Sequence, residues 1–436
     1  MSVDNFLLSA TTTDLNYPEV RPTLDLNFAR TKTLDPRITF TRASGGSYVG
    51  ADGLIKYAGV NEPRFDHDPV TGECKGFLVE EGRTNLFNES IPSINNWSNT
   101  ANIKTINNSS ISPDGSFTAA LIEATAKDSQ SRIENGGERT PGTTYTQSCF
   151  CKAGTVNYCT FGLYDTTSGV VNRQAIFYLV GNGSVTYNTN CVAIIIPYPN
   201  GWYRCIMITT ISSGSSYAGS SWKIGVCNLP TAYYTSNIGD NVYIWGAQLE
   251  RGSFPTSYIP TQGSARTRSQ DFPKIIGKDF TDFYNPIEGT ISITSSTYTD
   301  GSSYLNTLTF SDGSIVNLNN TIEIALTSSS LNNNVGRLTI RSNGISQADV
   351  NVGGIGLNLQ PNKRYKMIAS YKKDDFTFSV DGITYFSDTS GDVPLNISEL
   401  LIGYRLVSGS RLNGTISRLT YFPKRLPNAQ LQALTK

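Results

Sequence analysis

Apolar and polar residues alternate along much of the stretch 88–261. In TYTQSCFCKAG the alternation places four side chains on one face of an expected strand: Tyr145, Gln147, Cys149 and Cys151. QAIFYLVGNGSVTYN divides into two such runs, and GWYRCIMITTIS and SSWKIGVCN give two more. A period of two broken by short polar turns is typical of antiparallel strands. We therefore expect an antiparallel β-sandwich over 88–261.

The last run of this stretch, YIWGAQLERGSFPTSYIPT, sets a tryptophan and tyrosines beside a glutamate. Strict alternation assigns one apolar face to Tyr243, Trp245, Ala247 and Leu249. It assigns the other face to Val242, Ile244, Gly246, Gln248 and Glu250. A half-buried terminal strand explains this pattern, and Pro255 and Pro260 end it because proline donates no ladder hydrogen bond. We expect Trp245, like Trp202 in YPNGWYR, to lie in a packed core and not in the wall of a sugar-cutting site.

A second all-β pattern occupies residues 286–436. Its clearest strands are GTISITSSTY, TIEIALTS, GRLTIRSNG, YKMIASYKKDDFTFSVDGITYFS and NGTISRLTYFPKRL. Asp381-Gly382 marks a hairpin turn. Only the tail PNAQLQALTK predicts a helix, with Pro427 at its start and with Leu431 and Leu434 on one side. The two patterns together predict an all-β fold class.

Three further segments complete the expected division of the chain. Residues 1–22 are polar and aperiodic, and they are interpreted either as an arm that tethers the protein to a larger assembly or as a loosely ordered terminus. Residues 23–87 form short strands with hairpin signals at Asp52-Gly53 and Thr71-Gly72. Such hairpins are too small to bury a core alone, so we expect them to pack on a neighbouring domain or subunit. Residues 262–285 are expected to be a linker.

Composition excludes several classes of function. Charged residues make up 16% of the chain, the formal net charge is +0, and no long basic block occurs, which argues against a nucleic-acid partner. The longest strongly apolar run, CVAIIIP, is far shorter than a membrane span, and the first residues show no secretory signal. Seven cysteines without a CxxC pair, and His67 as the single histidine, argue against a Cys/His zinc site. We expect reduced, buried thiols and a protein that folds in a reducing cytosol.

Five phrases in fixed order carry a family resemblance over about residues 24–261: FTRAS, NEPRFDHDP, GFLVEEGRTNL, NGWYR and IWGAQLERGSFPTSYIPT. This stretch resembles the N-terminal module of bacteriophage head-spike and tail-fibre proteins. The segments YKMIASYKKDDFTFSVDG and LNGTISRLTYFPKRL are similar to concanavalin A-like or laminin-G-like sandwiches.

The resemblance implies a virion protein built from a jelly roll over 88–261 and a laminin-G-like sandwich over 286–436. It implies assembly in the host cytoplasm, a homotrimer, docking on other virion proteins through the N-terminal region, and no cofactor. Modules of this kind commonly bind cell-surface glycans or decorate the particle. Whether the appendage belongs to the capsid or to the tail is not fixed by the resemblance.

No residue pattern supports catalysis. Glycoside hydrolysis needs two carboxyl groups about 5–10 Å apart, and the E-x-D-x-x-E strand of concanavalin A-like glucanases does not occur. Glu80 and Glu81 should point to opposite faces of a strand, and Asp374-Asp375 should lie in a turn. His67 stands between Asp66 and Asp68 without a G-x-S-x-G elbow, so NEPRFDHDP is interpreted as a turn capped by its aspartates. A calcium site at Asp66 and Asp68 stays open as an alternative.

Sugar binding needs flat rings beside amide or charged groups. The loop NLPTAYYTSN offers Tyr233, Tyr234, Asn228 and Asn237. Two weaker candidates are Trp97 in NNWSN and the pair Tyr404 and Arg405 in IGYRLVSGSRLNG. Attachment to a host surface polysaccharide is the leading hypothesis, followed by a decoration or cement protein that binds no glycan, and then by a polysaccharide depolymerase.

Overall fold

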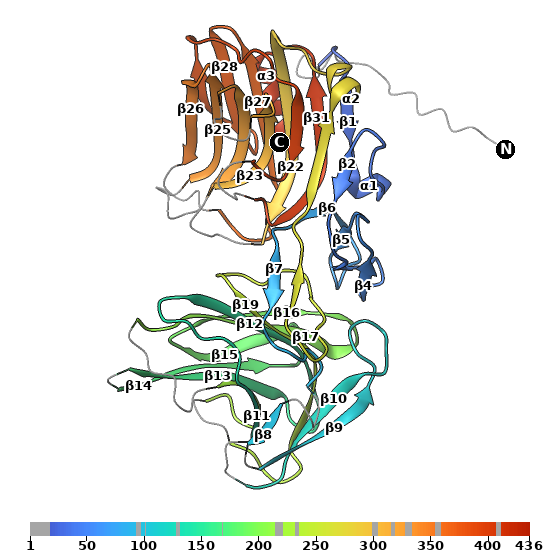
Figure 1. Cartoon of the computed structure of the whole chain (residues 1–436), viewed down its shortest axis with the longest axis vertical. Coiled ribbons are helices and arrows are strands. Elements are labelled where there is room, and N and C mark those ends of the chain that lie inside the picture. Colours follow the sequence, from blue (N-terminus) through green and yellow to red (C-terminus); the bar gives the residue numbers. More distant parts are fainter. Residues whose placement is uncertain are drawn as a thin grey trace, which may run out of the picture.

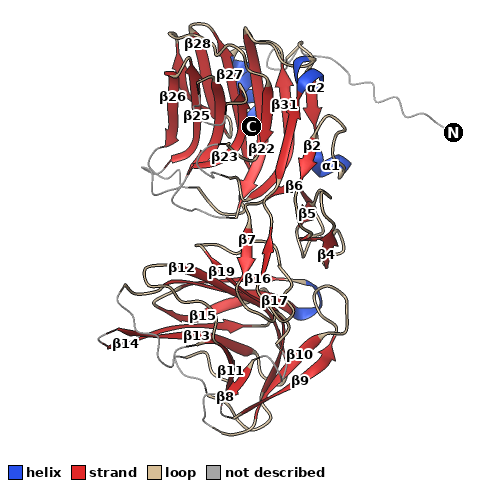
Figure 2. Cartoon of the chain, in the orientation of Figure 1, coloured by secondary structure: helices blue, strands red, loops and turns tan. Residues whose placement is uncertain are grey.

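A computed structural model describes residues 18–92, 97–100, 102–127, 131–167, 169–213, 221–231, 235–298, 304–314, 319–327, 334–353, 359–406 and 411–436. Two β-sandwiches stack end to end along the long axis and meet at a narrow junction (Figure 1). Strands and loops make up nearly all of both bodies, as the alternation predicts (Figure 2). Among the described residues, no helix has the length and apolar character to cross a membrane.

The first sandwich pairs two antiparallel sheets of six strands each. One sheet has the order β16 (Val192–Pro197), β17 (Trp202–Thr210), β12 (Thr144–Ala153), β19 (Asn241–Arg251), β10 (Ala119–Ala124) and β9 (Ile103–Ser110). The other has the order β15 (Ser184–Thr189), β14 (Gly169–Tyr178), β13 (Tyr158–Thr167), β18 (Trp222–Cys227), β11 (Arg132–Asn135) and β8 (Ser98–Thr100). Side chains at every second position of these strands fill the space between the sheets, which confirms the predicted antiparallel sandwich.

The second sandwich pairs a sheet of eight strands with a sheet of seven. The larger sheet contains β29 (Ile383–Asp388), β28 (Asp375–Val380), β27 (Tyr365–Lys372), β22 (Glu288–Thr297), β31 (Gly414–Phe422), β6 (Cys74–Val79), β5 (Phe65–His67) and β1 (Leu24–Leu26). The smaller contains β2 (Thr39–Thr41), β21 (Phe272–Ile276), β30 (Glu399–Ile402), β23 (Tyr304–Ser311), β24 (Thr321–Thr327), β25 (Asn334–Ser342) and β26 (Ile345–Gly353).

Short elements complete the structure. The helices are α1 (Phe28–Thr31), α2 (Gly277–Thr281) and α3 (Asn428–Thr435), with a 3₁₀ turn at Pro199–Gly201. Helix α3 follows Pro427 and buries Leu431 against the second sandwich, which confirms the helix predicted for the tail. Two-stranded ribbons join β3 (Gly46–Val49) to β4 (Ile55–Ala58) and β7 (Arg83–Asn85) to β20 (Arg266–Arg268).

Strand pairing differs from the expected division into a hairpin module, a linker and a distal domain. The N-terminal strands β1 and β6 both pair with β31, so residues from 24 onward are built into the second sandwich. The expected linker contains β20, β21 and α2, and its Ile275 and Phe280 are fully buried. The short N-terminal strands cannot bury a core alone, and the edges of the second sandwich supply one.

The first sandwich is therefore an insertion between two strands of the second. The chain leaves the second sandwich through β7 and returns through β20, and these two strands pair with each other at the junction (Figure 1). Two antiparallel backbone connections, tied by register pairs from Arg266–Asn85 to Arg268–Arg83, restrict rotation of one body against the other.

The face assignment along β19 is wrong for half of the strand. Gly246 adopts φ 64° and the register against β12 shifts there, because two residues of β19, Gly246 and Ala247, lie opposite one residue of β12. This bulge turns Ala247 and Leu249 into the core between the sheets, together with Val242 and Ile244. Trp245 instead lies on the outer face, in a smaller cluster with Ile55, Ala119, Phe150, Trp202 and Tyr258.

Both tryptophans are nevertheless interior residues, as predicted. Trp202 and Trp245 are each 1% exposed, because the β3–β4 hairpin and the segment after β19 cover the outer face of this sheet. Trp245 Nε1 donates to Thr118 Oγ1, and Trp202 Nε1 donates to the carbonyl oxygen of Ile111. These bonds tie the rings to the segment between β9 and β10, and Ile55 of the N-terminal hairpin packs in the same cluster.

Candidate functional site

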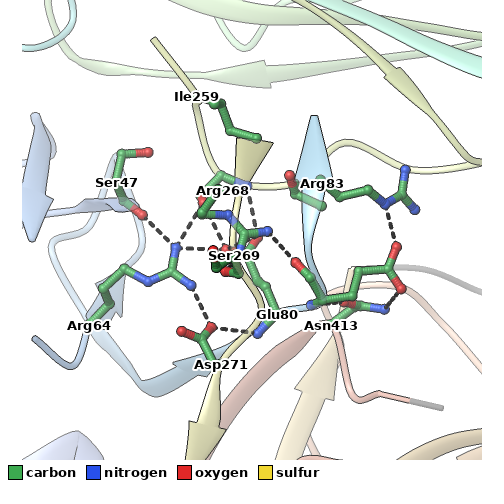
Figure 3. A network of polar contacts seen from close by, with 12 residues as sticks. Ser47, Arg64, Glu80, Arg83, Ile259, Arg268, Ser269, Asp271 and Asn413 are labelled. Atoms are coloured by element: carbon green, nitrogen blue, oxygen red, sulfur yellow. Dashed lines mark hydrogen bonds and ion pairs between the residues drawn. The ribbon is translucent and has the colours of Figure 1, made fainter. Parts of the chain in front are cut away.

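Charged side chains without solvent contact surround the two-strand connection. This junction network consists of Arg42, Arg64, Glu80, Arg268 and Asp271. Figure 3 shows the last four of these residues. Arg64 Nη1 lies 2.7 Å from Glu80 Oε2, and its Nη2 lies 2.6 Å from Asp271 Oδ2. Arg42 pairs with Asp271 at 3.2 Å and Arg268 with Glu80 at 3.6 Å. Each guanidinium of the network thus has a carboxylate partner.

Glu80 stays ionised at the centre of the network. Burial disfavours its charged form, but the guanidinium groups of Arg268 and Arg64 and two hydrogen bonds from Ser257 lower its pKa to about 2. Burial lowers the pKa of Arg42 and Arg268, and Asp271 and Glu80 oppose that shift. Removing one partner of such a cluster leaves a buried charge uncompensated.

The network also fixes the segment that follows β19. The backbone N–H and the hydroxyl of Ser257 donate to the two carboxylate oxygens of Glu80 at 2.8 and 2.7 Å. Two residues later the N–H of Ile259 donates to Gln248 Oε1 at 2.7 Å. Glu250, the glutamate of the opening motif, accepts from the N–H and the hydroxyl of Thr256. Glu250 therefore holds a loop and faces no cleft.

Beside the network lies a cavity of about 350 Å³, here called the junction cavity. One wall is the outer face of strands β16 and β17, where the cross-strand pairs are Val192–Ile208, Ile194–Ile206 and Ile196–Arg204. The other walls come from β3, from Asp66, from residues 253–258, from Tyr298 and from residues 361–362. A mostly apolar hollow with a few polar groups, at the contact between two bodies, is the usual form of a ligand site.

Asp66 is the one carboxylic acid among the described residues that line the cavity. Its Oδ1 accepts from the N–H of Val49 at 2.7 Å, and its Oδ2 accepts from the hydroxyl of Tyr298 at 2.7 Å. Burial raises the pKa of Asp66, against the opposing effects of Lys75 and of these two hydrogen bonds. Asp66 therefore serves as a tie between β3 and the second sandwich.

Arg204, on β17, also lines the cavity, and its hydrogen-bond partners differ from those of Asp66. Its Nη2 donates to the carbonyl of Thr256 at 2.8 Å and to Ser148 Oγ at 3.2 Å, and its guanidinium lies 5.7 Å from the centre of the Phe150 ring. In the part of the chain that the structure describes, no carboxylate lies within ion-pair distance of Arg204. Tyr198 packs edge-on against the same Phe150 ring at 5.0 Å and also lines the cavity.

Two of the aromatic residues proposed for sugar binding are buried, which corrects those assignments. Trp97 is 2% exposed, packs against Phe87, and donates from Nε1 to the carbonyl of Glu89. Tyr404 is 2% exposed and packs edge-on against Phe272. The run NNWSN precedes an edge strand and IGYR follows β30, and in both places the ring turns into the core, so neither ring presents a face to a sugar.

The remaining candidates do not form one site. Arg405 pairs with Glu323 at 3.1 Å on the second sandwich. Asn228 and Asn237 lie on the first sandwich, where the side chain of Asn228 and the backbone N–H of Asn237 both donate to Asp240. Tyr233 and Tyr234, which belong to the same loop, lie outside the described residues. The two asparagines therefore share the carboxylate of Asp240, and the structure does not describe the two tyrosine rings that were expected beside them.

The two aspartates of the open calcium alternative are occupied by different groups. Asp68 Oδ1 accepts from the N–H groups of Val70 and Thr71, which is the turn cap predicted for NEPRFDHDP. Asp66 binds Val49 and Tyr298 instead. Their side chains therefore serve separate turns and strands.

Three thiols meet inside the first sandwich. The Sγ atoms of Cys151, Cys159 and Cys205 lie within 4.8 Å of one another, and all three residues are buried. Burial raises the pKa of Cys151 and Cys205. Burial also acts to raise the pKa of Cys159, but hydrogen bonds with the other two thiols lower it to about 6. All seven cysteines are free and all except Cys191 are buried, as predicted for reduced thiols.

The junction cavity was not predicted from the sequence, in which CVAIIIP was interpreted only as a run too short for a membrane span. The sequence did contain a signal for it. The outward positions Val192, Ile194 and Ile196 of this edge strand are as apolar as its inward positions, and an apolar outer face indicates a binding or packing surface. Val192 and Ile194 are 58% and 40% exposed.

No family model matches the chain, and no curated protein matches it in sequence. Solved structures with partial likeness include a carbohydrate-binding module (CBM40) of a Ruminococcus gnavus sialidase, with 13% identity, a TM-score of 0.30, and coverage of 35% of this chain and 84% of that one. Domain 4 of a GH43 arabinanase from Geobacillus stearothermophilus, in complex with arabinotriose, gives 12% identity, a TM-score of 0.30, and coverage of 42% and 82%.

Domains LG4-5 of the mouse laminin α1 chain give 9% identity, a TM-score of 0.25, and coverage of 81% of this chain and 92% of that one. Likeness at this level carries no argument about function. The description of the protein as an all-β chain of two antiparallel sandwiches rests on its own strand pairing.

Proposed function

We propose that this chain is a non-enzymatic virion appendage subunit that attaches a bacteriophage to a host surface glycan through the junction cavity. The virion setting, the homotrimer and the docking of the N-terminal region on other virion proteins follow the sequence resemblance stated above. The observation that carries the attachment role is the cavity itself, a hollow of about 350 Å³ lined by residues of both sandwiches. The buried junction network holds one lining residue, Ser257, through Glu80.

Rigidity supports this role. An adhesin must transmit force between its particle and its target, and two bodies joined by paired strands and buried ion pairs resist bending at the joint. A site at that joint is also preorganised, because its walls are already held by Glu80 and Glu250. Affinity per site can be low, since many copies on a particle raise the effective concentration.

The chemistry of the cavity supports binding over cleavage. Glycosidases need a second carboxyl group facing the first, and Asp66 has no acidic counterpart among the described lining residues. The alternative of a cement or decoration protein without a glycan is favoured by one observation, the burial of Trp97 and Tyr404, which removes two of the rings expected to touch sugar.

A glycan array probed with the full-length chain tests the attachment role. We expect saturable binding that Ile194→Asp abolishes, because the new charge falls on the apolar wall of the cavity. Ile345→Asp is the matched control, since Ile345 is 67% exposed on the second sandwich and does not line the cavity. Binding that survives Ile194→Asp would place the glycan site elsewhere, and absence of binding to host polysaccharide would favour the cement role.

A further inference from the structure

We propose that the junction cavity selects a sugar that carries a carboxylate, and that Arg204 is the residue that binds this group. The inference rests on the proposed glycan attachment and adds the chemical class of the ligand. It follows from the hydrogen-bond state of one guanidinium and from the arrangement of apolar side chains beside it.

Arg204 retains donor capacity that no described residue uses. Its Nη2 has two acceptors, whereas its Nε is enclosed without any partner. Nη1 also lacks a partner among the described residues but is not among the enclosed atoms, so it keeps contact with the open space that Arg204 lines. Arg204 is 8% exposed, and a cation buried to this degree without a counter-ion is unfavourable.

A bound anion would supply the missing partner. Each arginine of the junction network, a few residues away in space, meets a carboxylate inside the protein. The described lining of the cavity holds two cationic side chains, Arg204 and Lys75, and the single acid Asp66, whose two oxygens are already bonded. Lys75 lies 3.8 Å from the carboxylate of Asp68, whereas Arg204 has no such partner among the described residues. The charge of Arg204, which no described carboxylate compensates, therefore favours an anionic ligand.

A second donor, the hydroxyl of Tyr198, belongs to a residue that lines the same cavity and packs on the same Phe150 ring as Arg204. The hydroxyl of Tyr198 has no hydrogen-bond partner in the described part of the chain and is not enclosed. Burial raises the pKa of Tyr198 to about 12, although the charge of Arg204 lowers it, so the phenol stays protonated and can donate. A guanidinium N–H and a phenol O–H that line one cavity can serve the two oxygens of one carboxylate.

The rest of the wall sets the orientation of the ligand. Arg204 faces Ile196 across the strand pair, and the next pairs along β16 and β17 are Ile194–Ile206 and Val192–Ile208. A sugar whose carboxylate lies at Arg204 would rest its C–H face, or a methyl or acetyl substituent, on these isoleucines. The volume of about 350 Å³ is at the small end for ligand sites, which suits a terminal residue better than the middle of a polymer.

The test compares ligand pairs that differ in one group. The full-length protein is titrated with oligosaccharides that end in a uronic or sialic acid, with the same compounds after reduction of the carboxyl group to an alcohol, and with sulfated analogues. We expect the carboxylated forms to bind about ten-fold or more tightly than the reduced forms, as for a charge-assisted hydrogen bond. This ligand comparison requires no mutation, so a folding defect cannot obscure it.

Variants then assign the effect to Arg204. Arg204→Met should bring the affinities for the acidic and reduced ligands to within about two-fold, and Arg204→Lys should restore part of the difference because it retains the charge. Arg37→Met, a change at a partly exposed arginine of the second sandwich, should leave the preference intact. Thermal unfolding of each variant serves as the folding control.

The outcomes separate the two proposals. Equal affinity for acidic and reduced ligands, or tighter binding of sulfated ligands, would overturn the carboxylate assignment and leave glycan attachment standing. A preference for acidic sugars that Arg204→Met does not alter would overturn the role of Arg204. Absence of binding to every oligosaccharide would overturn both proposals.

Discussion

Buried arginines occupy two adjacent regions of the junction and differ in what they bind. In the junction network, Arg64 contacts Glu80 and Asp271 at 2.7 and 2.6 Å, and no ligand is needed to balance the charges. In the junction cavity, Arg204 has backbone and hydroxyl acceptors on Nη2 alone. The difference teaches that burial of a charge does not by itself indicate function. A donor left without a partner beside open space is the more informative signal.

The largest effect is expected from breaking the network. Glu80→Gln removes the charge that compensates Arg64 and Arg268, and the free energy of unfolding should fall by about 3–5 kcal/mol. Urea denaturation of the full chain measures this change, with Glu19→Gln at an exposed position as the control. A loss below about 1 kcal/mol would show that the network is dispensable.

Acid should weaken the same region. The pKa of Glu80 is lowered from 4.5 to about 2 in the folded protein, so its contribution is complete above about pH 4.5 and is lost as the pH falls toward 2. By linkage the loss is about 3 kcal/mol. Denaturation midpoints measured between pH 6 and pH 2 should show this decline in the wild type, and Glu80→Gln should lack the corresponding component.

Arg204→Met should separate the two regions. The stability change should stay near 1–2 kcal/mol, roughly the contribution of the two hydrogen bonds from Nη2. Affinity for a carboxylated sugar should fall about ten-fold at the same time. Urea denaturation and calorimetric titration of one preparation give both numbers. A destabilisation as large as that of Glu80→Gln would mean that Arg204 is a structural residue like those of the network.

The smallest effect is expected at Asp66. Burial raises its pKa, so the protonated form gains in the fold, and stability should decrease as the pH rises through the folded pKa. Asp66→Asn removes that loss and retains an acceptor for the N–H of Val49. We expect a change within about 1 kcal/mol at pH 7, of either sign, by thermal unfolding. A large loss would indicate that Asp66 is ionised and essential.

Local chemistry accounts for the parts of the structure that the sequence predicted. The Asp381-Gly382 hairpin appears with φ 46° and 80°, as a tight primed turn requires, and the inward face of β12 follows from simple alternation. The interior position of Trp245 was predicted correctly, but its face was not, because Gly246 inserts a bulge that a period-two pattern does not reveal.

The junction cavity could not be predicted from the sequence, for a different reason. Residues 47–49, 66, 192–208, 253–258 and 298 come together through long-range strand pairing, such as that of β6 with β31 across more than 330 positions of the chain. Pattern reasoning gives the strands but not pairing at that separation. It therefore assigned sugar contacts to rings near strand ends, such as Trp97, which the fold buries.

A structure of the full-length protein with a carboxylated oligosaccharide tests the central claim most directly. The account predicts ligand density in the junction cavity, with the carboxylate within hydrogen-bond distance of Arg204 Nη1 and the hydroxyl of Tyr198, and with the sugar ring along Ile194 and Ile206. Ligand density at the Asn228 and Asn237 loop, with the cavity unoccupied, would contradict it.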